Sequence, residues 1–586
     1  MTLQDIRSKG GFGRPFFMAA SSPVGRLAWS LVYAAVTLAW LIPNHYPPWT
    51  SYYNEASMVV GLVVLTVVVW TSRGSGSVPR SAWFVVGVAL IPWLQFGIGV
   101  LHYSGDAFIA SAYVVSLAVA IAAAHRSAEA APSRLALLLS FAALTAAVVS
   151  AVFAVSQTLQ LASWGIWADL TTTDSRAGGN LAQANNFATL LGLGAAGAMY
   201  LYERRRLPRV LAFAMVGLLV LAGAFTQSRV SLALGPMFTA ALWLLRARGV
   251  ATRTSLAFVA VLTLLHWTLM FSAPSILIAL FGEAPATLVS RGVATPRYQM
   301  WGMLLEAVRL RPWQGYGWLQ VGAAELAVVD GHPPVNELWL QGHDVFIELV
   351  VWCGWPIGLL LSGALLFWYV TRLSRVKSIE AAVGMLAISA VGLHALVELP
   401  HHYAYFLVPA GLWAGIVEQD EGAMTTAGAR WLMAPAVAAL AIFMGIALTY
   451  PAVEEDFRLV RFEGARIGNV HASEPAPDAP LLSTLTSFLR FARTVPRTGM
   501  SEAQLAEMAA STKRYPYAAS LARYASALAL NGHPNEASRT FVKIRYIYGD
   551  KTYVRFRDDL RDKVAQGQAG LATLDALLPA VESLRP

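Results

Sequence analysis

The chain has 586 residues, of which 56% are hydrophobic and only 13% are charged. Soluble domains carry about 25% charged residues, so this composition excludes an ordinary soluble protein and indicates a membrane protein. The net charge of +9 does not indicate a nucleic-acid partner, because most basic residues stand in short loops between apolar runs, as membrane topology requires. The single cysteine, Cys353, lies within an apolar run and provides no intrachain disulfide.

Apolar runs long enough to cross a bilayer recur from Val24 to Tyr450. A helical span needs about 20 apolar residues, and each span must satisfy its own backbone hydrogen bonds in lipid. The sequence therefore predicts an all-α, polytopic helical membrane protein with about 13 transmembrane helices. The predicted spans, in chain order, are about 24–43, 57–71, 82–101, 107–124, 135–157, 185–202, 209–226, 230–245, 254–281, 343–371, 378–398, 403–418 and 431–450.

Basic and non-basic loops alternate between these spans. The N-terminal segment, "ERRRLPR" and "TRLSRVK" are basic, whereas "NHYPPWTSYYNEAS" contains no Lys or Arg. Because cytoplasmic loops carry the excess of Lys and Arg, we expect the N-terminus in the cytoplasm. The same alternation predicts that the loops 157–184 and 282–342, the "PHHY" segment and the tail lie on the outer side.

The sequence predicts two domains, a transmembrane domain over 1–450 and an outer helical domain over 451–586. The tail contains the amphipathic segments "SEAQLAEMAASTKRY", "PYAASLARYASALALNG" and "HPNEASRTFVKIRYIYGD", in which Ser501, Pro516 and Pro534 are start signals and Gly532 is a stop signal. The last two segments resemble a single tetratricopeptide unit, which cannot bury its own face alone. Two roles remain open for this domain, contact with an acceptor and stabilisation of the membrane domain.

Several arginines on the outer side depart from the charge pattern of the loops. Arginine presents a rigid fork that binds phosphate oxygens bidentately and stays charged, so these residues indicate an anionic ligand. Arg229 stands between two apolar runs in "GAFTQSRVSLALG", where the alternative is snorkelling to lipid headgroups. Arg297 opens a helix with an apolar stripe, and Arg309 and Arg311 end it, where cations favour the helix dipole. The outer arginines are Arg176, Arg229, Arg291, Arg297, Arg309 and Arg311.

His343 is the best candidate for a general base, because a neutral imidazole accepts a proton from a hydroxyl near neutral pH. Asp344 either orients that ring or caps the following span, and Glu348 is given no chemical role. The alternative is that His343 is structural. A second polar cluster, "ELPHHYAYF", lies on the same predicted side. No carboxylate pair or cysteine cluster with ligand spacing accompanies the histidines, so no metal and no cofactor are predicted.

The sequence resembles the bacterial protein O-oligosaccharyltransferases of pilin and general O-glycosylation type, within the O-antigen ligase and polymerase superfamily. The resemblance covers about residues 20–450, and the tail is only weakly similar. It rests on the order and spacing of the segments "RAGGNLAQANNFATLLGLG", "TQSRVSLALG", "RYQMWGMLLEAVRLRPWQGYGWLQ", "GHDVFIELVVWCGWPIGLLL" and "HALVELPHHYAYFLVPAGLWAG".

The resemblance implies a bacterial inner-membrane enzyme whose site faces the periplasm. Such enzymes transfer a preassembled glycan from undecaprenyl diphosphate to a Ser or Thr hydroxyl of a pilin-like or other periplasmic protein. His343 matches the essential histidine of the family, Arg229 and Arg297 match the arginines that bind the diphosphate, and Tyr405 matches a functional tyrosine. Further substrate contacts are expected at Arg176, Asn180, Gln183, Asn185, Arg291, Asp344 and His402.

Two positions depart from the family pattern. Ala184-Asn185-Asn186 stands where Pro-Asn-His is expected, and Asp344 follows the loop histidine where Asn is common. The implied mechanism fits the residues without a metal, because a diphosphate is a good leaving group and arginines can stabilise the developing charge. His343 would take the acceptor's proton in a single displacement, which inverts the anomeric centre.

Three alternatives share part of this evidence. One is transfer to a lipid A core sugar or polymerisation of O-antigen repeats by the same kind of fold. Another is a transporter of lipid-linked sugars, although transporters place charged residues and broken helices at mid-membrane, whereas here the ionisable groups gather at one face. The last is a scaffold without activity, which the outer arginines make the least favoured.

Overall fold

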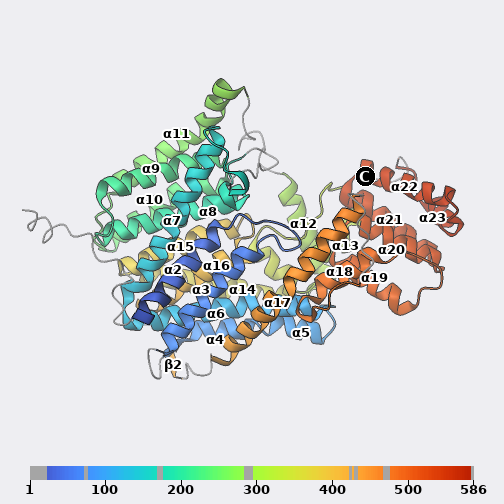
Figure 1. Cartoon of the computed structure of the whole chain (residues 1–586), viewed down its shortest axis with the longest axis horizontal. Helices are drawn as coiled ribbons and strands as arrows, with labels where there is room; N and C mark the ends of the chain where they lie inside the picture. Colours follow the sequence, from blue (N-terminus) through green and yellow to red (C-terminus); the bar gives the residue numbers. More distant parts are fainter. Residues whose placement is uncertain are drawn as a thin grey trace, which may run out of the picture. The chain divides into compact units, whose positions relative to one another are not determined.

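The computed structural model describes residues 23–71, 77–167, 176–282, 295–420, 425–427, 433–465 and 475–581 (Figure 1). These residues are mainly helical, and one antiparallel pair of strands joins β1 (Ser77–Pro79) to β2 (Thr425–Ala427), with Val78 opposite Thr426. The chain forms two compact units. Unit 1 contains Met1–Ala89, Ala112–Val293 and Leu365–Ala441, and unit 2 contains Leu90–Ser111, Ala294–Ala364 and Ile442–Pro586.

The α-helices of unit 1 are α2 (Pro23–Leu41), α3 (Tyr52–Thr71), α4 (Arg80–Val88), α7 (Pro132–Thr158), α8 (Ala184–Glu203), α9 (Arg209–Phe225), α10 (Arg229–Ala247), α11 (Leu256–Phe281), α15 (Ile379–Ala395) and α16 (Ala404–Asp420). Three helices contribute residues to both units: α6 (Ser104–Ala130), α14 (Val345–Arg375) and α17 (Met433–Gly464).

The α-helices of unit 2 are α5 (Ile91–Gly97), α12 (Thr295–Leu310), α13 (Val321–Val328), α18 (Ser483–Arg493), α19 (Glu502–Arg514), α20 (Ala518–Leu530), α21 (Pro534–Tyr548), α22 (Asp550–Ala565) and α23 (Ala572–Leu577). Short 3-10 turns are η2 (Gly165–Trp167), η3 (Gly179–Leu181), η4 (Val329–Gly331), η5 (Pro400–His402), η7 (Pro480–Leu482) and η8 (Ala569–Leu571).

Within the described residues, eight helices are long and apolar enough to cross a membrane, namely α2, α3, α6, α7, α10, α11, α14 and α17. The helices α9 and α15 are apolar but shorter. All of them coincide with predicted spans, and the expectation of an all-α, polytopic membrane protein is confirmed. The helices α8 and α16 also fill predicted spans. Most residues of α8 are buried among its neighbours.

The core of unit 1 is built around α8, which packs against α7, α9, α10 and α15. Glycines let α7 approach it closely, since an added Cβ at Gly197 would lie 2.6 Å from the Ser140 carbonyl oxygen. A Cβ at Gly194 would lie 2.4 Å from the Cβ of Ala147. Small residues serve helix pairs in lipid in this way, because no hydrophobic force draws such helices together. The close packing fixes the N-terminal end of α8, where Asn185 and Asn186 stand.

The predicted third span, 82–101, is not one helix. It consists of α4, a turn at Ala89 and Leu90, and α5, whose first turn contains Pro92. Proline lacks an N–H and suits the start of a helix rather than its interior, so a new helix begins near Pro92. The prediction of one continuous span over 82–101 is therefore wrong. The side chain of Gln95 is buried and bonds to the backbone of Trp318 (2.9 Å) and Trp352 (2.7 Å).

The predicted span 343–371 corresponds to α14, which is interrupted at Gly354 (φ 74°, ψ 176°). The loop that follows α12 fills the interruption, with the Trp355 N–H donating to the Pro312 carbonyl (2.8 Å) and the Tyr316 N–H donating to the Val351 carbonyl (2.9 Å). An added Cβ at Gly354 would lie 2.6 Å from the Pro312 oxygen. Irregular backbone is tolerated at membrane depth when protein satisfies it. Here it is satisfied by backbone groups and by the Gln95 side chain, without a charged group.

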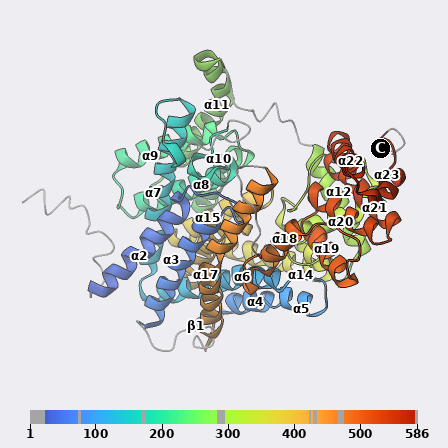
Figure 2. The same ribbon diagram turned by 45° about the vertical axis from the view of Figure 1, so that its right-hand side comes forward.

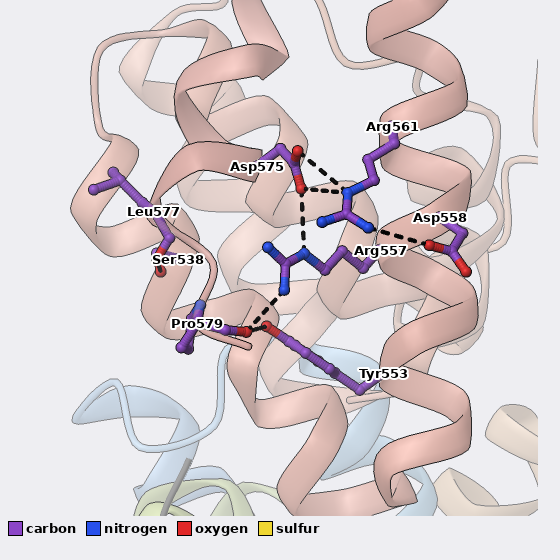
Figure 3. A network of polar contacts seen from close by, with 8 residues as sticks. All are labelled: Ser538, Tyr553, Arg557, Asp558, Arg561, Asp575, Leu577 and Pro579. Carbon is purple, nitrogen blue, oxygen red and sulfur yellow. Dashed lines mark hydrogen bonds and ion pairs between the residues drawn. The ribbon is translucent and has the colours of Figure 1, made fainter. Parts of the chain in front are cut away.

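The described tail is helical, as predicted. Ser501 caps α19 and forms a capping box with Gln504, Pro534 stands in the first turn of α21, and Gly532 adopts φ +87° after α20. The helices α20 and α21 pack as a pair, and α18, α19, α22 and α23 extend this bundle (Figure 2). Figure 3 shows how its last part closes: Arg557 and Arg561 of α22 both bond to Asp575 of α23 (3.2 and 3.1 Å).

Candidate active site

The His343 loop of unit 2, residues 342–344, has an unusual backbone. His343 adopts φ +52°. Residues other than glycine rarely take this left-handed backbone conformation, and where they do it is often at a functional site. Both backbone polar groups of Gly342 are held by side chains. Its N–H donates to Oε1 of Glu348 (2.7 Å), and its carbonyl accepts from Nε1 of Trp301 (2.8 Å). The strained turn is therefore held from two sides.

Asp344 caps α14. Its Oδ1 accepts the backbone N–H groups of Phe346 and Ile347, both at 2.9 Å, as an N-terminal acceptor does. Of the two roles considered from the sequence, ring orientation and capping, these bonds belong to capping. The carboxylate thus fixes where the helix begins, directly after His343.

Glu348 was given no chemical role, and the structure shows what its side chain does. It is fully buried, and its carboxylate accepts the N–H of Gly342 across the turn that contains His343. Sequence spacing suggested only that Glu348 lies off the His343 face. An acidic residue within an apolar run is costly to place in the membrane. This cost could have predicted that Glu348 has a specific hydrogen-bond partner.

Arg297 lies in the first turn of α12 and is half-buried. It stands four residues before Trp301, so the two residues share one face of the helix. Since Trp301 bonds to Gly342, that face is directed at the His343 loop. The apolar stripe of α12 includes Met300, Leu304 and Val308, which are buried.

The segment 321–340, which precedes the His343 loop in the chain, is anchored to the tail helices. The Lys543 ammonium donates to the Leu326 carbonyl (2.7 Å) and pairs with Asp330 (3.4 Å), and the Val335 N–H donates to the Tyr546 carbonyl (2.9 Å). The tail therefore holds part of the segment that leads to His343.

Glu325, in α13, is fully buried. Its Oε2 accepts the Trp339 N–H (2.8 Å), and its Oε1 has no partner among the described residues. Loss of hydration on burial raises the pKa of Glu325 to about 8, and the nearby carboxylate of Glu337 adds to the shift. The carboxyl group is consequently protonated in much of the neutral pH range.

A second polar cluster lies in unit 1, where α8, α10 and α15 approach each other. The Asn185 amide donates to Oε1 of Glu398 (3.1 Å), and its carbonyl oxygen accepts from Oγ of Ser228 (2.6 Å). Ser228 caps α10 and immediately precedes Arg229, whose side chain is exposed. Asn185 therefore links the start of α10 to Glu398. Ser228 was not singled out from the sequence, although its position before an apolar helix is a capping signal.

Arg176 precedes Ala177, whose N–H donates to the Phe225 carbonyl at the end of α9 (3.3 Å). The backbone at Arg176 is thus placed beside the corner 226–229 that leads to Arg229. Two of the arginines singled out from the sequence are brought to the same part of unit 1 by this contact, as an anionic ligand would require.

Tyr405 is buried in α16. Its hydroxyl accepts from the Asn186 amide (3.2 Å), its carbonyl accepts from Trp40 (2.8 Å), and its ring stacks on Tyr403 with centroids 5.1 Å apart. Asn186 occupies the place where the family pattern suggested histidine, and it contacts the tyrosine that the resemblance singled out. Next to this cluster His401 and His402 have ring centroids 4.6 Å apart.

Three further predicted contacts differ in their surroundings. Asn180 is fully buried and engaged by protein, since its amide donates to the Trp40 carbonyl (2.7 Å) and its oxygen accepts from Ser150 (2.6 Å). Both polar ends of the Asn180 side chain are thus bonded within the protein. The amide oxygen of Gln183, at the start of α8, is buried and has no partner in the described chain. Arg291 lies outside the described residues.

The two clusters offer complementary chemistry. Unit 2 holds an imidazole on a constrained turn together with Arg297, and unit 1 holds Arg229 and Arg176 with amide and hydroxyl groups around Asn185. Guanidinium groups suit a diphosphate, and imidazole suits proton abstraction from a hydroxyl. The fold and these residues define a multi-pass membrane protein with arginines and a candidate base at His343.

Comparison with known proteins agrees with this class. Residues 381–560 match a family described as "Virulence factor membrane-bound polymerase, C-terminal". The chain is 26% identical over 534 residues to the "General O-oligosaccharyltransferase" of Acinetobacter baylyi, which covers 88% of this chain and 91% of that protein. It is 24% identical over 381 residues to the "ComP-specific O-oligosaccharyltransferase" of the same organism, which covers 65% of this chain and 69% of that protein.

The similarity extends beyond the membrane domain into the tail, since it covers 88% of the chain in one relative. The resemblance to protein O-oligosaccharyltransferases that was stated from the sequence is confirmed, and the expectation of an oligosaccharyltransferase is supported by both names.

Proposed function

We propose that the protein is an O-oligosaccharyltransferase of the bacterial inner membrane that transfers a preassembled glycan en bloc from undecaprenyl diphosphate to a Ser or Thr hydroxyl of a periplasmic protein. The observation that carries this proposal is the similarity over 534 residues to a protein named as a general O-oligosaccharyltransferase. A pilin-like protein is one acceptor of the proposed kind.

In the proposed reaction His343 accepts the proton of the acceptor hydroxyl as its oxygen attacks the anomeric carbon. The bond from that carbon to the diphosphate breaks, undecaprenyl diphosphate leaves, and the anomeric centre is inverted. Arg229 and Arg297 bind the diphosphate and stabilise the charge that develops on it, so no metal is needed. Arg176, Gln183, Asn185 and His402 contribute further contacts to the donor.

The structure supports specific roles for three other residues in this proposal. Glu348 and Trp301 hold the backbone of the His343 loop, which keeps the base in one place. Asn186 orients the Tyr405 hydroxyl. Such positioning matters because misplacement of a reacting group by about 1 Å can cost 10²-fold in rate.

Transfer to a sugar is the second candidate, because the matched family is described as a polymerase. It differs from the first only in the acceptor, which is a lipid A core sugar or the end of a second lipid-linked glycan. The same base and arginines would serve it.

The test offers one purified protein several acceptors. The full chain is incubated with a defined undecaprenyl-diphosphate glycan and, in parallel, with a pilin-like protein, with lipid A core, or with no added acceptor. Glycosylated protein supports the first candidate, and glycosylated core or lengthened glycan supports the second. Unchanged donor in every arm, from a preparation that binds the donor, contradicts both.

His343→Ala provides the matching variant. We expect it to bind donor normally and to transfer about 10²–10⁴-fold more slowly, which is the usual effect of a positioned general base. Wild-type turnover by this variant would show that His343 is structural and that the base lies elsewhere.

A further inference from the structure

A cavity of about 220 Å³ lies among α8, α9, α10 and α11 of unit 1. The helices surround it in a ring, because α8 contacts α9, α9 contacts α11, α11 contacts α10 and α10 contacts α8. Figure 1 shows these four helices together, in teal and green. All residues that line the cavity belong to this unit and are described by the structure.

The cavity is lined mainly by apolar side chains, including Met199, Val216, Leu234 and Phe258. Its lining along α9 extends from Arg209 to Gly223, which is about 21 Å at 1.5 Å per residue. The hydrocarbon core of a bilayer is roughly 30 Å thick, so the chains of one leaflet span about 15 Å, and the lining along α9 is longer than that. The length of the lining and its apolar side chains fit a single long apolar chain.

One end of the cavity is cationic. Arg209 and Arg253 both line it, and both side chains are exposed. The Arg253 guanidinium lies over the Tyr202 ring (4.4 Å) and bonds to the Tyr202 carbonyl, and Arg209 lies over the Phe213 ring (5.1 Å). A guanidinium has five N–H donors, so the bond to Tyr202 leaves capacity for a phosphate.

Glu203 is an acidic group at this end of the cavity. Its carboxylate oxygens accept the N–H groups of Arg253 and Thr254 and the Thr254 hydroxyl. These bonds occupy the carboxylate with backbone and hydroxyl donors. The adjacent chain also contains Arg205 and Arg206, both exposed, so the excess charge around the cavity's cationic end is positive.

Away from Arg209 and Arg253, the lining contains no Lys, Arg, Asp or Glu. There Ser231 bonds to His266 (3.2 Å), and an added Cβ at Gly223 would lie 3.0 Å from the Ser231 hydroxyl. Arg229, which the proposed function assigns to the donor's diphosphate, is not among the residues that line the cavity. The charged mouth is therefore separate from the proposed donor site.

We propose that this cavity binds an anionic phospholipid, with one acyl chain between α8, α9, α10 and α11 and the headgroup phosphate at Arg209 and Arg253. The charge of the mouth selects the headgroup, and the apolar lining accepts the chain. A neutral phospholipid would gain only the apolar contacts. The bound lipid would fill the space between the helix that begins at Arg229 and its neighbours, and so stabilise unit 1.

The test measures binding of phosphatidylglycerol and phosphatidylcholine to the delipidated full-length protein in detergent, by native mass spectrometry and by the shift in melting temperature. We expect phosphatidylglycerol to bind and stabilise, and phosphatidylcholine to have little effect. The double variant R209Q/R253Q should bind phosphatidylglycerol on the order of tenfold to thirtyfold more weakly. The reason is that each basic residue at a membrane surface raises the affinity for anionic lipid about fivefold.

Two further variants make the test specific. R205Q/R206Q removes two positive charges from the segment just before Arg209, at residues that do not line the cavity, and should bind like wild type. Ala195→Phe fills the cavity, since Ala195 lines it, and should reduce binding while Arg209 and Arg253 remain. The proposal is overturned if both double variants lose phosphatidylglycerol binding equally, or if Ala195→Phe binds it as wild type does. Either result would show that the lipid is attracted only to the charged surface.

The donor's own chain is the competing occupant. Undecaprenyl phosphate is added to the phosphatidylglycerol complex, and we expect no displacement. Displacement that Ala195→Phe also abolishes would assign the cavity to the isoprenoid chain and refute the phospholipid. This binding assay needs no glycan transfer, so its outcome is independent of the proposed function.

Discussion

Replacement of Glu348 tests whether the His343 loop is held by its surroundings. The Gly342 N–H donates to Glu348 at 2.7 Å, and the carboxylate is fully buried. In Glu348→Ala the buried N–H loses its partner, which costs about 1–3 kcal/mol. If that free energy is what keeps His343 in its productive position, transfer slows roughly 5- to 150-fold.

Glu348→Gln separates positioning from chemistry. The Gln carbonyl oxygen can accept the same N–H, so we expect its rate to stay within about threefold of wild type, well above that of the Ala variant. Gly342→Ala is an independent perturbation, because the new Cβ would lie 2.9 Å from Cγ of Glu348. We expect it to resemble Glu348→Ala. Glu337→Ala is the matched control, because Glu337 is exposed and lies in the segment that precedes the His343 loop.

The assay is single-turnover transfer with saturating donor, followed over pH 5.5–8.5 together with donor affinity. A loosened loop lowers the rate constant at every pH and leaves donor affinity nearly unchanged. A Gln variant as slow as the Ala variant would refute the reasoning, because it would show that the negative charge itself takes part. An Ala variant at the wild-type rate would show that the turn needs no support from α14.

The remaining predictions concern charge, metal, pH and the tail. Arg229→Lys or Arg297→Lys should slow transfer by on the order of 10²-fold or more, because a point charge cannot replace the bidentate fork. Wild-type kinetics in both would leave lipid snorkelling as the explanation for Arg229. Transfer should survive EDTA, and loss that a divalent cation restores would contradict metal independence. Glu325 has a folded-state pKa of about 8, above its ordinary value of 4.5. The unfolded state therefore loses its proton first, and stability falls as pH rises between these values, by up to roughly 1.4 kcal/mol per pH unit. Thermal unfolding should show this slope in wild type and lose it in Glu325→Gln; equal slopes would refute the assignment. Asp575→Asn removes the shared partner of Arg557 and Arg561. It should destabilise the end of the tail by about 1 kcal/mol, seen as faster proteolytic release, and unchanged release would contradict it.

Helix positions were accessible from the sequence because the signal is local. Eight predicted spans are helices long and apolar enough to cross a membrane, and the caps at Ser501 and Pro534 are where their residue types indicated. The failure at 82–101 has a local cause too, since a hydropathy average does not register that Pro92 starts a new helix.

The break in α14 could not be read from its apolar run. Gly354 and Pro356 are breaker residues, yet each also occurs in continuous membrane helices. The break is stable because the backbone near Pro312, some forty residues earlier, supplies hydrogen bonds. Whether such a partner exists depends on how a separate loop folds.

Composition, loop charge and motif order by themselves determined a multi-pass helical membrane protein that resembles O-oligosaccharyltransferases, and they indicated His343, Arg229 and Arg297. These features follow from hydropathy and side-chain chemistry, which are properties of each residue by itself. Tertiary structure alone decided that Glu348 and Trp301 hold the His343 turn, that Asn180 bonds to Trp40 and Ser150, and that Arg209 and Arg253 border a cavity. Those roles depend on contacts between residues far apart in the chain, and no local pattern specifies which buried polar group meets which partner.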